Sequence, residues 1–177
     1  MSSNPIFIPT MVLNNGLRIP VLGLGTAVEK DEMSKVCDAV RAAITVGYRL
    51  IDTATLYGTE SEVGRAVNSA IASCDVTRGE LFILTKVYMD SMSRVGVMES
   101  ARKSLERLGL DYVDCLLVHF PVPMKRGSNF EPDSSIDIYS DTWRGMEDVY
   151  RAGLAKSIGV SNYNAAQIEE LVKVRIS

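Results

Sequence analysis

Four side chains in this sequence, those of Asp52, Tyr57, Lys86 and His119, could act together to move a proton, and three of them stand at equivalent places. A short apolar run directly precedes each of three ionisable residues: Asp52, Lys86 and His119. If these runs are neighbouring parallel strands, the three side chains meet at the carboxyl edge of one sheet, where α/β proteins build their active sites. Tyr57 follows Asp52 closely enough for its phenol to reach the same edge.

This set of groups fits the reduction of a carbonyl by hydride. The oxygen that becomes an alkoxide needs a proton donor, and a phenol with a reference pKa of about 10 is a weak donor unless a neighbouring cation lowers that pKa. Lys86 is the candidate cation, and Asp52 would hold its ammonium in place and charged. His119 would fix the carbonyl oxygen by a hydrogen bond. The hydride must come from a cofactor, because no side chain can donate one.

Each of the four residues also has an ordinary structural interpretation. An Asp at a strand end commonly forms a turn or caps a helix, a Lys there is commonly solvated, a single His is often a hydrogen-bonded structural residue, and most tyrosines pack. Their joint placement at consecutive strand ends favours catalysis. The segment Gly23-Leu-Gly25-Thr26 lacks the third glycine of a dinucleotide fingerprint, so a plain turn and a close approach to a flat ring both stay open.

The elements that must position these residues follow a repeating pattern. Asn15-Gly16 between two apolar runs predicts a β-hairpin with a type I′ turn over residues 11–19. After it, five short apolar runs alternate with amphipathic stretches of helical period, which is typical of βα units on a parallel sheet. The predicted strands are residues 21–25, 48–51, 81–84, 113–118 and 156–160.

The helix between two strands is expected to begin and end at recognisable residues. Thr59 and Glu62 have the spacing of a capping box, and Asn164 is a candidate cap for the last helix. The segment 121–137, rich in Pro, Gly, Ser, Asn and Asp, delays the fourth helix. Loops of this length within a domain are usually functional.

Residues 1–177 are expected to form a single domain, but periodicity leaves two architectures open. Five βα units suit either a doubly wound open sheet or part of a barrel, because both obey the same right-handed crossover rule. A complete (β/α)8 barrel needs about 250 residues, whereas this chain has 177. In a barrel, five units would leave the first and fifth strands with unpaired edges, which promote association.

Composition and charge argue against several classes of protein. A formal net charge of −3 argues against an extended nucleic-acid surface, and no stretch approaches the roughly 20 apolar residues of a membrane helix. Cys37, Cys74 and Cys115 are widely spaced and there is a single histidine, which predicts reduced thiols and no metal site. The sequence therefore predicts a cytosolic protein that binds neither nucleic acid nor membrane.

Three longer segments resemble the aldo-keto reductase superfamily, and they follow one another in the family's order. They are residues 47–64, residues 108–121 and residues 153–162, so the resemblance runs through nearly the whole chain. It implies a (β/α)8 TIM barrel of the aldo-keto reductase type, present here as an incomplete barrel of about five βα units. The N-terminal hairpin would close the floor of that barrel.

The resemblance also implies a role for each candidate site residue. Tyr57 corresponds to the general acid, Lys86 and Asp52 to the pair that lowers its pKa, and His119 to the residue that orients the carbonyl. NADPH would lie across the carboxyl mouth of the barrel, and loop 121–137 is similar to one that borders the substrate pocket. Asp52 and four further residues would contact the cofactor: Gly25, Thr26, Ser161 and Asn162.

Two features depart from the usual family pattern. Thr59 stands where the family often has Asn, as in the plant-type branch resembling chalcone and codeinone reductases, and Thr caps a helix comparably well. The last three βα units are absent from this sequence. With them are absent the Lys/Arg segment that grips the 2′-phosphate of NADPH and the C-terminal substrate loop.

The sequence therefore predicts an oxidoreductase that reduces an aldehyde or ketone, as a small-molecule carbonyl substrate, to an alcohol with NAD(P)H, from a full-length parent that is monomeric. For the 177 residues alone we expect weak or absent activity. One alternative is a truncated, non-catalytic fragment that binds a partner, or itself, through exposed strand edges. Another is a flavodoxin-like binding module of five strands, against which the lack of a phosphate-cradling glycine loop counts.

Overall fold

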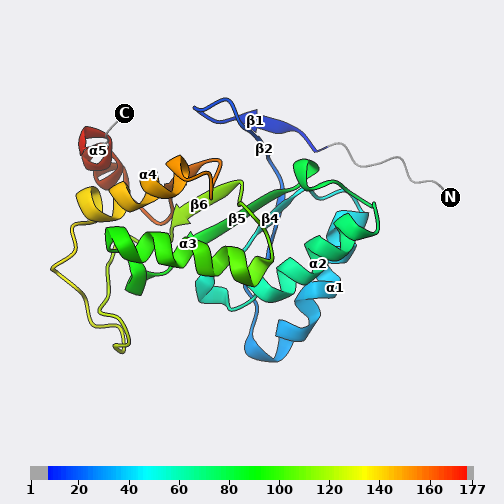
Figure 1. The fold of residues 1–177 in the computed structure, drawn as a ribbon, viewed down its shortest axis with the longest axis horizontal. Helices are drawn as coiled ribbons and strands as arrows, with labels where there is room; N and C mark the ends of the chain where they lie inside the picture. Colours follow the sequence, from blue (N-terminus) through cyan, green and yellow to red (C-terminus); the bar gives the residue numbers. More distant parts are fainter. Residues whose placement is uncertain (1–7, 175–177) are drawn as a thin grey trace.

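A five-stranded parallel sheet forms the centre of the molecule (Figure 1), and the computed structural model describes residues 8–174. Every strand is short, because each apolar run gives way within a few residues to the polar group or turn that follows it. The strands are β3 (Gly23–Gly25), β4 (Leu50–Asp52), β5 (Phe82–Val87), β6 (Cys115–Val118) and β7 (Ile158–Val160).

Each strand of this sheet pairs with the next one along the chain. The order is β3-β4-β5-β6-β7, and all four pairings are parallel. A doubly wound or flavodoxin-like sheet reverses its strand order at a switch point. No reversal occurs here, so the sheet is part of a (β/α)8 barrel, which confirms the predicted fold class and argues against the flavodoxin-like alternative.

Helices connect successive strands and pack on their neighbours in chain order, α1 on α2, α2 on α3 and α3 on α4. In Figure 1 this places α1 and α5 at opposite sides of the view. The helices are α1 (Val36–Thr45), α2 (Glu60–Ala72), α3 (Arg94–Leu108), α4 (Trp143–Arg151) and α5 (Ala165–Val174). Shorter helical segments precede or separate them: η1 (Lys30–Lys35), η2 (Thr55–Tyr57), η3 (Arg78–Glu80), η4 (Met89–Ser91) and the π-helical η5 (Ile138–Thr142).

The N-terminal hairpin is present, but its turn differs from the prediction. β1 (Thr10–Val12) pairs antiparallel with β2 (Arg18–Pro20). The loop between Leu13 and Leu17 has three residues, and of these only Gly16 has a positive φ, at 85°. A type I′ turn needs two such residues, so the predicted turn type was wrong. The geometry is that of a type I turn followed by a glycine bulge.

The predicted helix caps divide into one that forms and one that does not. Asn164 accepts a hydrogen bond from the Gln167 backbone N–H at 2.9 Å, and the Gln167 side chain accepts one from the Asn164 N–H at 2.9 Å. The predicted capping box of Thr59 and Glu62 was wrong, because Thr59 has helical backbone angles and makes no capping bond. Its hydroxyl faces inward to other threonines instead.

Two apolar clusters hold the fold together. The larger lies between the helices and the outer face of the sheet and includes Ile51, Ile83 and Leu116, each at most 1% exposed. The smaller lies inside the barrel, where Phe82 packs with Leu17 and other hairpin residues. The hairpin therefore covers the amino ends of the strands, as the family resemblance implied.

The sheet has two open edges within residues 8–174. β3 and β7 each pair on one side only. Apolar side chains near these edges are exposed, among them Val21 and Leu22 before β3 and Ile168 and Val172 on α5. The same helix α5 buries Leu171. One of its faces is therefore packed against the protein, while Ile168 and Val172 stay exposed.

The cysteines, the lengths of the helices and the possible metal ligands also bear on the sequence predictions. Cys37, Cys74 and Cys115 form no disulfide. Within residues 8–174, no helix is both long and apolar enough to cross a membrane. The same residues contain no group of three His, Cys, Asp or Glu side chains placed to hold a metal ion.

Gly64 allows α2 to approach the end of α3, and this contact gives the first prediction. A Cβ at position 64 would lie 2.4 Å from the carbonyl oxygen of Leu108, which also accepts a hydrogen bond from Asn68 at 3.0 Å. Gly64→Ala should lower the free energy of unfolding by about 1–3 kcal/mol, measured by urea denaturation. In an exposed helix the same change would stabilise by up to about 1 kcal/mol.

Gly79→Ala is the matched control, because a Cβ there meets no atom within 4 Å. We expect it to change the free energy of unfolding by no more than about 0.5 kcal/mol. Equal effects of the two substitutions would contradict the proposed backbone contact.

Candidate active site

The alternation of side chains along β5 and β6 carries two of the candidate residues to the mouth of the barrel. Phe82 and Leu84 of β5 point into the barrel interior, so Lys86, the next residue of that face, points the same way at the carboxyl end. The same alternation from Cys115 of β6 brings His119 to this edge. The ionisable side chains therefore lie together at one edge of the sheet, as the sequence predicts.

Lys86 is a buried cation with three acceptors. Its side chain is 5% exposed, and its ammonium forms an ion pair with Asp52. The Nζ atom also donates to the backbone oxygen of Thr53 and to the hydroxyl of Tyr57, each at 3.1 Å. A buried charge is costly unless it is paired and hydrogen-bonded, and here all three of its protons have a partner.

Tyr57 is held at the end of the short turn η2. Its backbone N–H donates to Ala54 at 3.1 Å, and Gly58, in the left-handed region with φ of 69°, ends the turn. The Lys86 ammonium lies 4.7 Å from the centre of the phenol ring. The hydroxyl of residue 57 and the amine of residue 86 therefore face each other on one side of the sheet.

His119 lies against the phenol and is nearly buried. Its ring meets the Tyr57 ring edge-on, with 5.5 Å between centroids, and stacks on Phe120 at 4.6 Å. Burial, and then the nearby Lys86 charge, hold the pKa of His119 below its ordinary value of 6.5, although Asp52 acts in the opposite direction. The imidazole is therefore neutral at pH 7. Its buried Nδ1 has no hydrogen-bond partner among the described residues.

Two of the predicted cofactor contacts lie beside His119 at the end of β7. Asn162 has a positive φ of 61°, and its side-chain amide donates to the His119 backbone oxygen at 2.7 Å and to the Ser161 hydroxyl at 3.1 Å. This leaves the Asn162 side-chain oxygen free to accept and the Ser161 hydroxyl free to donate. The pair can therefore bind one primary amide group.

The other two predicted cofactor residues lie beside β4. Gly25 is exposed, and nothing stands within 4 Å of where its Cβ would be, so a flat ring can approach its backbone. Thr26 is 2% exposed, and its hydroxyl contacts the Asp52 backbone oxygen at 3.0 Å. The side chain of Thr26 therefore binds within the protein and supports the strand that carries Asp52.

A cluster of hydroxyls that no sequence pattern indicates lies behind Asp52. The Thr59 hydroxyl lies 3.1 Å from both the Thr26 and the Thr53 hydroxyls, and all three residues are at most 2% exposed. Threonines are common in turns and strands, so no spacing in the sequence marks this cluster. The cluster links Thr26, which follows β3, to Thr53, whose backbone oxygen accepts a hydrogen bond from Lys86.

Loop 121–137 stands at the same end of the barrel. Met124 donates its backbone N–H to Met89 of η4 at 2.9 Å, and Lys125 donates to Glu131 across the loop at 2.8 Å. Because η4 follows β5, this anchor places the loop beside the strand end that carries Lys86. Its predicted contact with a substrate stays a prediction.

Comparisons with known proteins place the chain in a family. The Aldo/keto reductase family profile matches residues 21–177. This chain belongs to the aldo/keto reductase family. It is similar to aldo-keto reductase AKR2E4 of Bombyx mori, with 47% identity over 170 residues that cover 93% of this chain and 53% of that protein. It is also similar to estradiol 17 beta-dehydrogenase 5 of Mus musculus, with 43% identity over 173 residues that cover 93% and 53%.

Solved structures of family members share the fold. The crystal structure of Bombyx mori AKR2E4 in complex with NADP superposes with a TM-score of 0.91 and 45% identity, covering 97% of this chain and 56% of that one. The structure of AKR2E5 complexed with NADPH gives a TM-score of 0.90 and 41% identity, with coverage of 97% and 53%. The chain thus spans about half the length of the relatives it matches. The predicted plant-type branch is untested by these comparisons and stays a prediction.

The lowered pKa of His119 predicts how stability depends on pH. Below pH 6.5 the unfolded chain binds a proton at this imidazole that the folded chain does not bind. Stability should therefore fall as the pH decreases from 6.5 through the lower pKa of the folded state. Urea denaturation of the wild type and of His119→Gln at a series of pH values from about 7.5 to 5 measures this, and the variant should show a flatter dependence. Parallel curves for the two proteins would contradict it.

Proposed function

We propose that this chain carries the proton-donating half of a carbonyl reductase, which converts an aldehyde or ketone to an alcohol with NADPH. The observation that supports this most directly is the 3.1 Å contact between the Tyr57 hydroxyl and the Lys86 ammonium, which is itself paired with Asp52. Because the chain spans about half of its relatives, the activity is proposed for the whole barrel to which these residues belong.

Tyr57 is the proposed general acid. Its hydroxyl gives its proton to the carbonyl oxygen, which would otherwise become a free alkoxide. The phenolate that remains is stabilised by the ammonium of Lys86 beside it, and solvent then returns the proton. Asp52 is a positioning residue in this scheme, since its carboxylate orients the ammonium that contacts the phenol.

His119 is proposed to orient the carbonyl oxygen toward the phenol. A neutral imidazole offers one N–H donor and does not compete with Tyr57 as an acid. Its edge-on contact with the Tyr57 ring places both groups at one point of the mouth. The carbonyl oxygen would receive a hydrogen bond from each.

The residues around this point fit the nicotinamide end of the cofactor. A nicotinamide bears a primary amide, which matches the free acceptor of Asn162 and the free donor of Ser161. Gly25 leaves room for a flat ring on the opposite side of the mouth. When bound, NADPH supplies the hydride that reaches the carbonyl carbon. The relatives crystallised with NADP and NADPH support this assignment.

A second candidate function is the binding of a partner chain through the open edges of the sheet. It is favoured by the unpaired sides of β3 and β7 within residues 8–174 and by the exposed Val21, Leu22, Ile168 and Val172. Unpaired strand edges with apolar neighbours are templates for association. Sedimentation over a range of protein concentrations would show it as a mass above that of the monomer.

Substitution of the phenol separates the two candidate functions. Oxidation of NADPH by an aromatic aldehyde is followed by absorbance at pH 7, at a protein concentration high enough to measure slow turnover. Tyr57→Phe should lower kcat by about 100- to 10,000-fold, because it removes the proton donor and little else. Tyr150→Phe is the control, since Tyr150 is 45% exposed on α4 and makes no hydrogen bond to the four candidate catalytic residues.

Turnover by Tyr57→Phe at the wild-type rate would contradict the reductase proposal. A folded wild-type chain that consumes no NADPH at all would favour the partner-binding candidate for these 177 residues, because the reductase activity is proposed for the whole barrel.

A further inference from the structure

A buried carboxylate lies directly behind the candidate active site. Glu60 is the first residue of α2 and is 1% exposed. Its Oε2 accepts from Arg107 at 2.6 Å, and its Oε1 accepts from the Thr85 hydroxyl at 2.6 Å. A Glu in the first turn of a helix is ordinarily explained by its favourable interaction with the helix dipole. That interaction requires neither burial of the carboxylate nor a hydrogen-bond partner, and Glu60 has both.

One branch of this network reaches the turn that carries Tyr57. Arg107, on α3, donates a second hydrogen bond to the Thr55 hydroxyl at 3.1 Å and a third to Ser104 at 3.2 Å. Thr55 is the first residue of η2 and Tyr57 is its last. A single turn has few hydrogen bonds of its own, so the Arg107 contact limits how far the phenol can move.

The other branch reaches the strand that carries Lys86. Thr85 is fully buried and directly precedes Lys86 on β5. Because side chains alternate along a strand, Thr85 faces the helices while Lys86 faces the mouth. Glu60 thus contacts β5 through the Thr85 side chain, from the side opposite to the ammonium.

We propose that Glu60 is a positioning residue, which sets the spacing between the Tyr57 hydroxyl and the Lys86 ammonium by holding both η2 and β5. The proposal rests on the roles assigned above to Tyr57 and Lys86. It differs from a purely stabilising role, because a buried ion pair often adds little to stability compared with apolar residues of the same size. The hydrogen bonds that connect Glu60, Arg107, Thr55 and Thr85 can all form in one arrangement of η2 and β5, so they favour that arrangement.

His119 gives a readout that needs no catalysis. It is the only histidine in the sequence, so its imidazole gives one set of NMR signals. Its ring lies edge-on to Tyr57, and its pKa is lowered by burial and by Lys86, with Asp52 opposing. Glu60 makes its hydrogen bonds to Thr85 and Arg107 and makes none to His119. A change at His119 after a substitution at position 60 therefore reports a movement of Tyr57 or Lys86.

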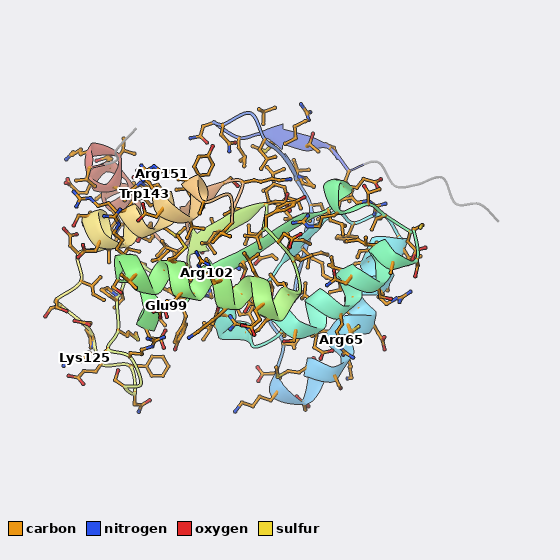
Figure 2. The ribbon with its side chains drawn as sticks, viewed as in Figure 1. Arg65, Glu99, Arg102, Lys125, Trp143 and Arg151 are labelled. Atoms are coloured by element: carbon orange, nitrogen blue, oxygen red, sulfur yellow. The ribbon has the colours of Figure 1, made fainter. Side chains whose placement is uncertain are left out.

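The test compares Glu60→Met with Glu62→Met in the 177-residue chain. Met keeps the length of the side chain and removes every hydrogen bond. Glu62 lies on the same helix, but its partner Arg65 is 64% exposed on the surface (Figure 2). In Glu60→Met we expect loss of the NOE between His119 and Tyr57 and a rise of the His119 titration midpoint toward 6.5. Glu62→Met should match the wild type in both measurements.

The conservative variant should restore the geometry. In Glu60→Gln the amide oxygen still accepts from Arg107 and the amide nitrogen donates to the Thr85 hydroxyl, so we expect a wild-type NOE and midpoint. A folded Glu60→Met with an unchanged NOE and midpoint would overturn the proposal and leave Glu60 a structural residue.

A second substitution decides the matter if Glu60→Met does not fold. Thr55→Val removes the acceptor of the Arg107 bond without leaving a buried charge, and it should weaken the NOE between His119 and Tyr57. An unchanged NOE would overturn the proposal. These signals are independent of turnover, so an inactive chain in which they respond as expected would support the positioning role of Glu60 and count only against catalysis by these 177 residues.

Discussion

A buried ammonium is the group around which the site is organised. Lys86 is surrounded by the Asp52 carboxylate, the Thr53 backbone oxygen and the Tyr57 phenol, which come from β4 and from the turn that follows it. An ammonium withdrawn from water must find acceptors for its protons, so the ends of β4 and β5 cannot shift independently. The need to compensate one charge therefore also fixes the geometry that the proposed proton transfer would require. The contacts that stabilise the buried ammonium are the same contacts on which the proposed function rests.

Much of the fold was readable from the sequence because its main signals are periodic. Short apolar runs that alternate with amphipathic stretches predicted the order of strands and helices, and polar residues at the ends of three runs predicted Asp52, Lys86 and His119 at one edge. The choice between an open sheet and a barrel could not come from periodicity, since both obey the same crossover rule. The family resemblance made that choice, and the strand order confirms it.

The features that the sequence did not reveal are contacts between distant residues. Thr59 has the spacing of a cap, yet its hydroxyl faces Thr26 and Thr53, and this depends on how α2 packs against the sheet. The turn at Gly16 was assigned to the wrong type because one dipeptide fits several hairpin geometries. Glu60 belongs to a recognisable motif, but its burial between Thr85 and Arg107 becomes visible only when three elements are assembled.

The chain-order pairing of the sheet also bears on how the molecule forms during synthesis. Each strand docks beside the one that left the ribosome just before it, so no strand has to wait for a distant segment before its first ladder can close. Contacts between near neighbours in sequence carry a small loop-closure cost and form quickly. Because the sheet grows in one direction, β7 is the last strand added among the described residues. Its unpaired edge is the surface on which any later strand would pair.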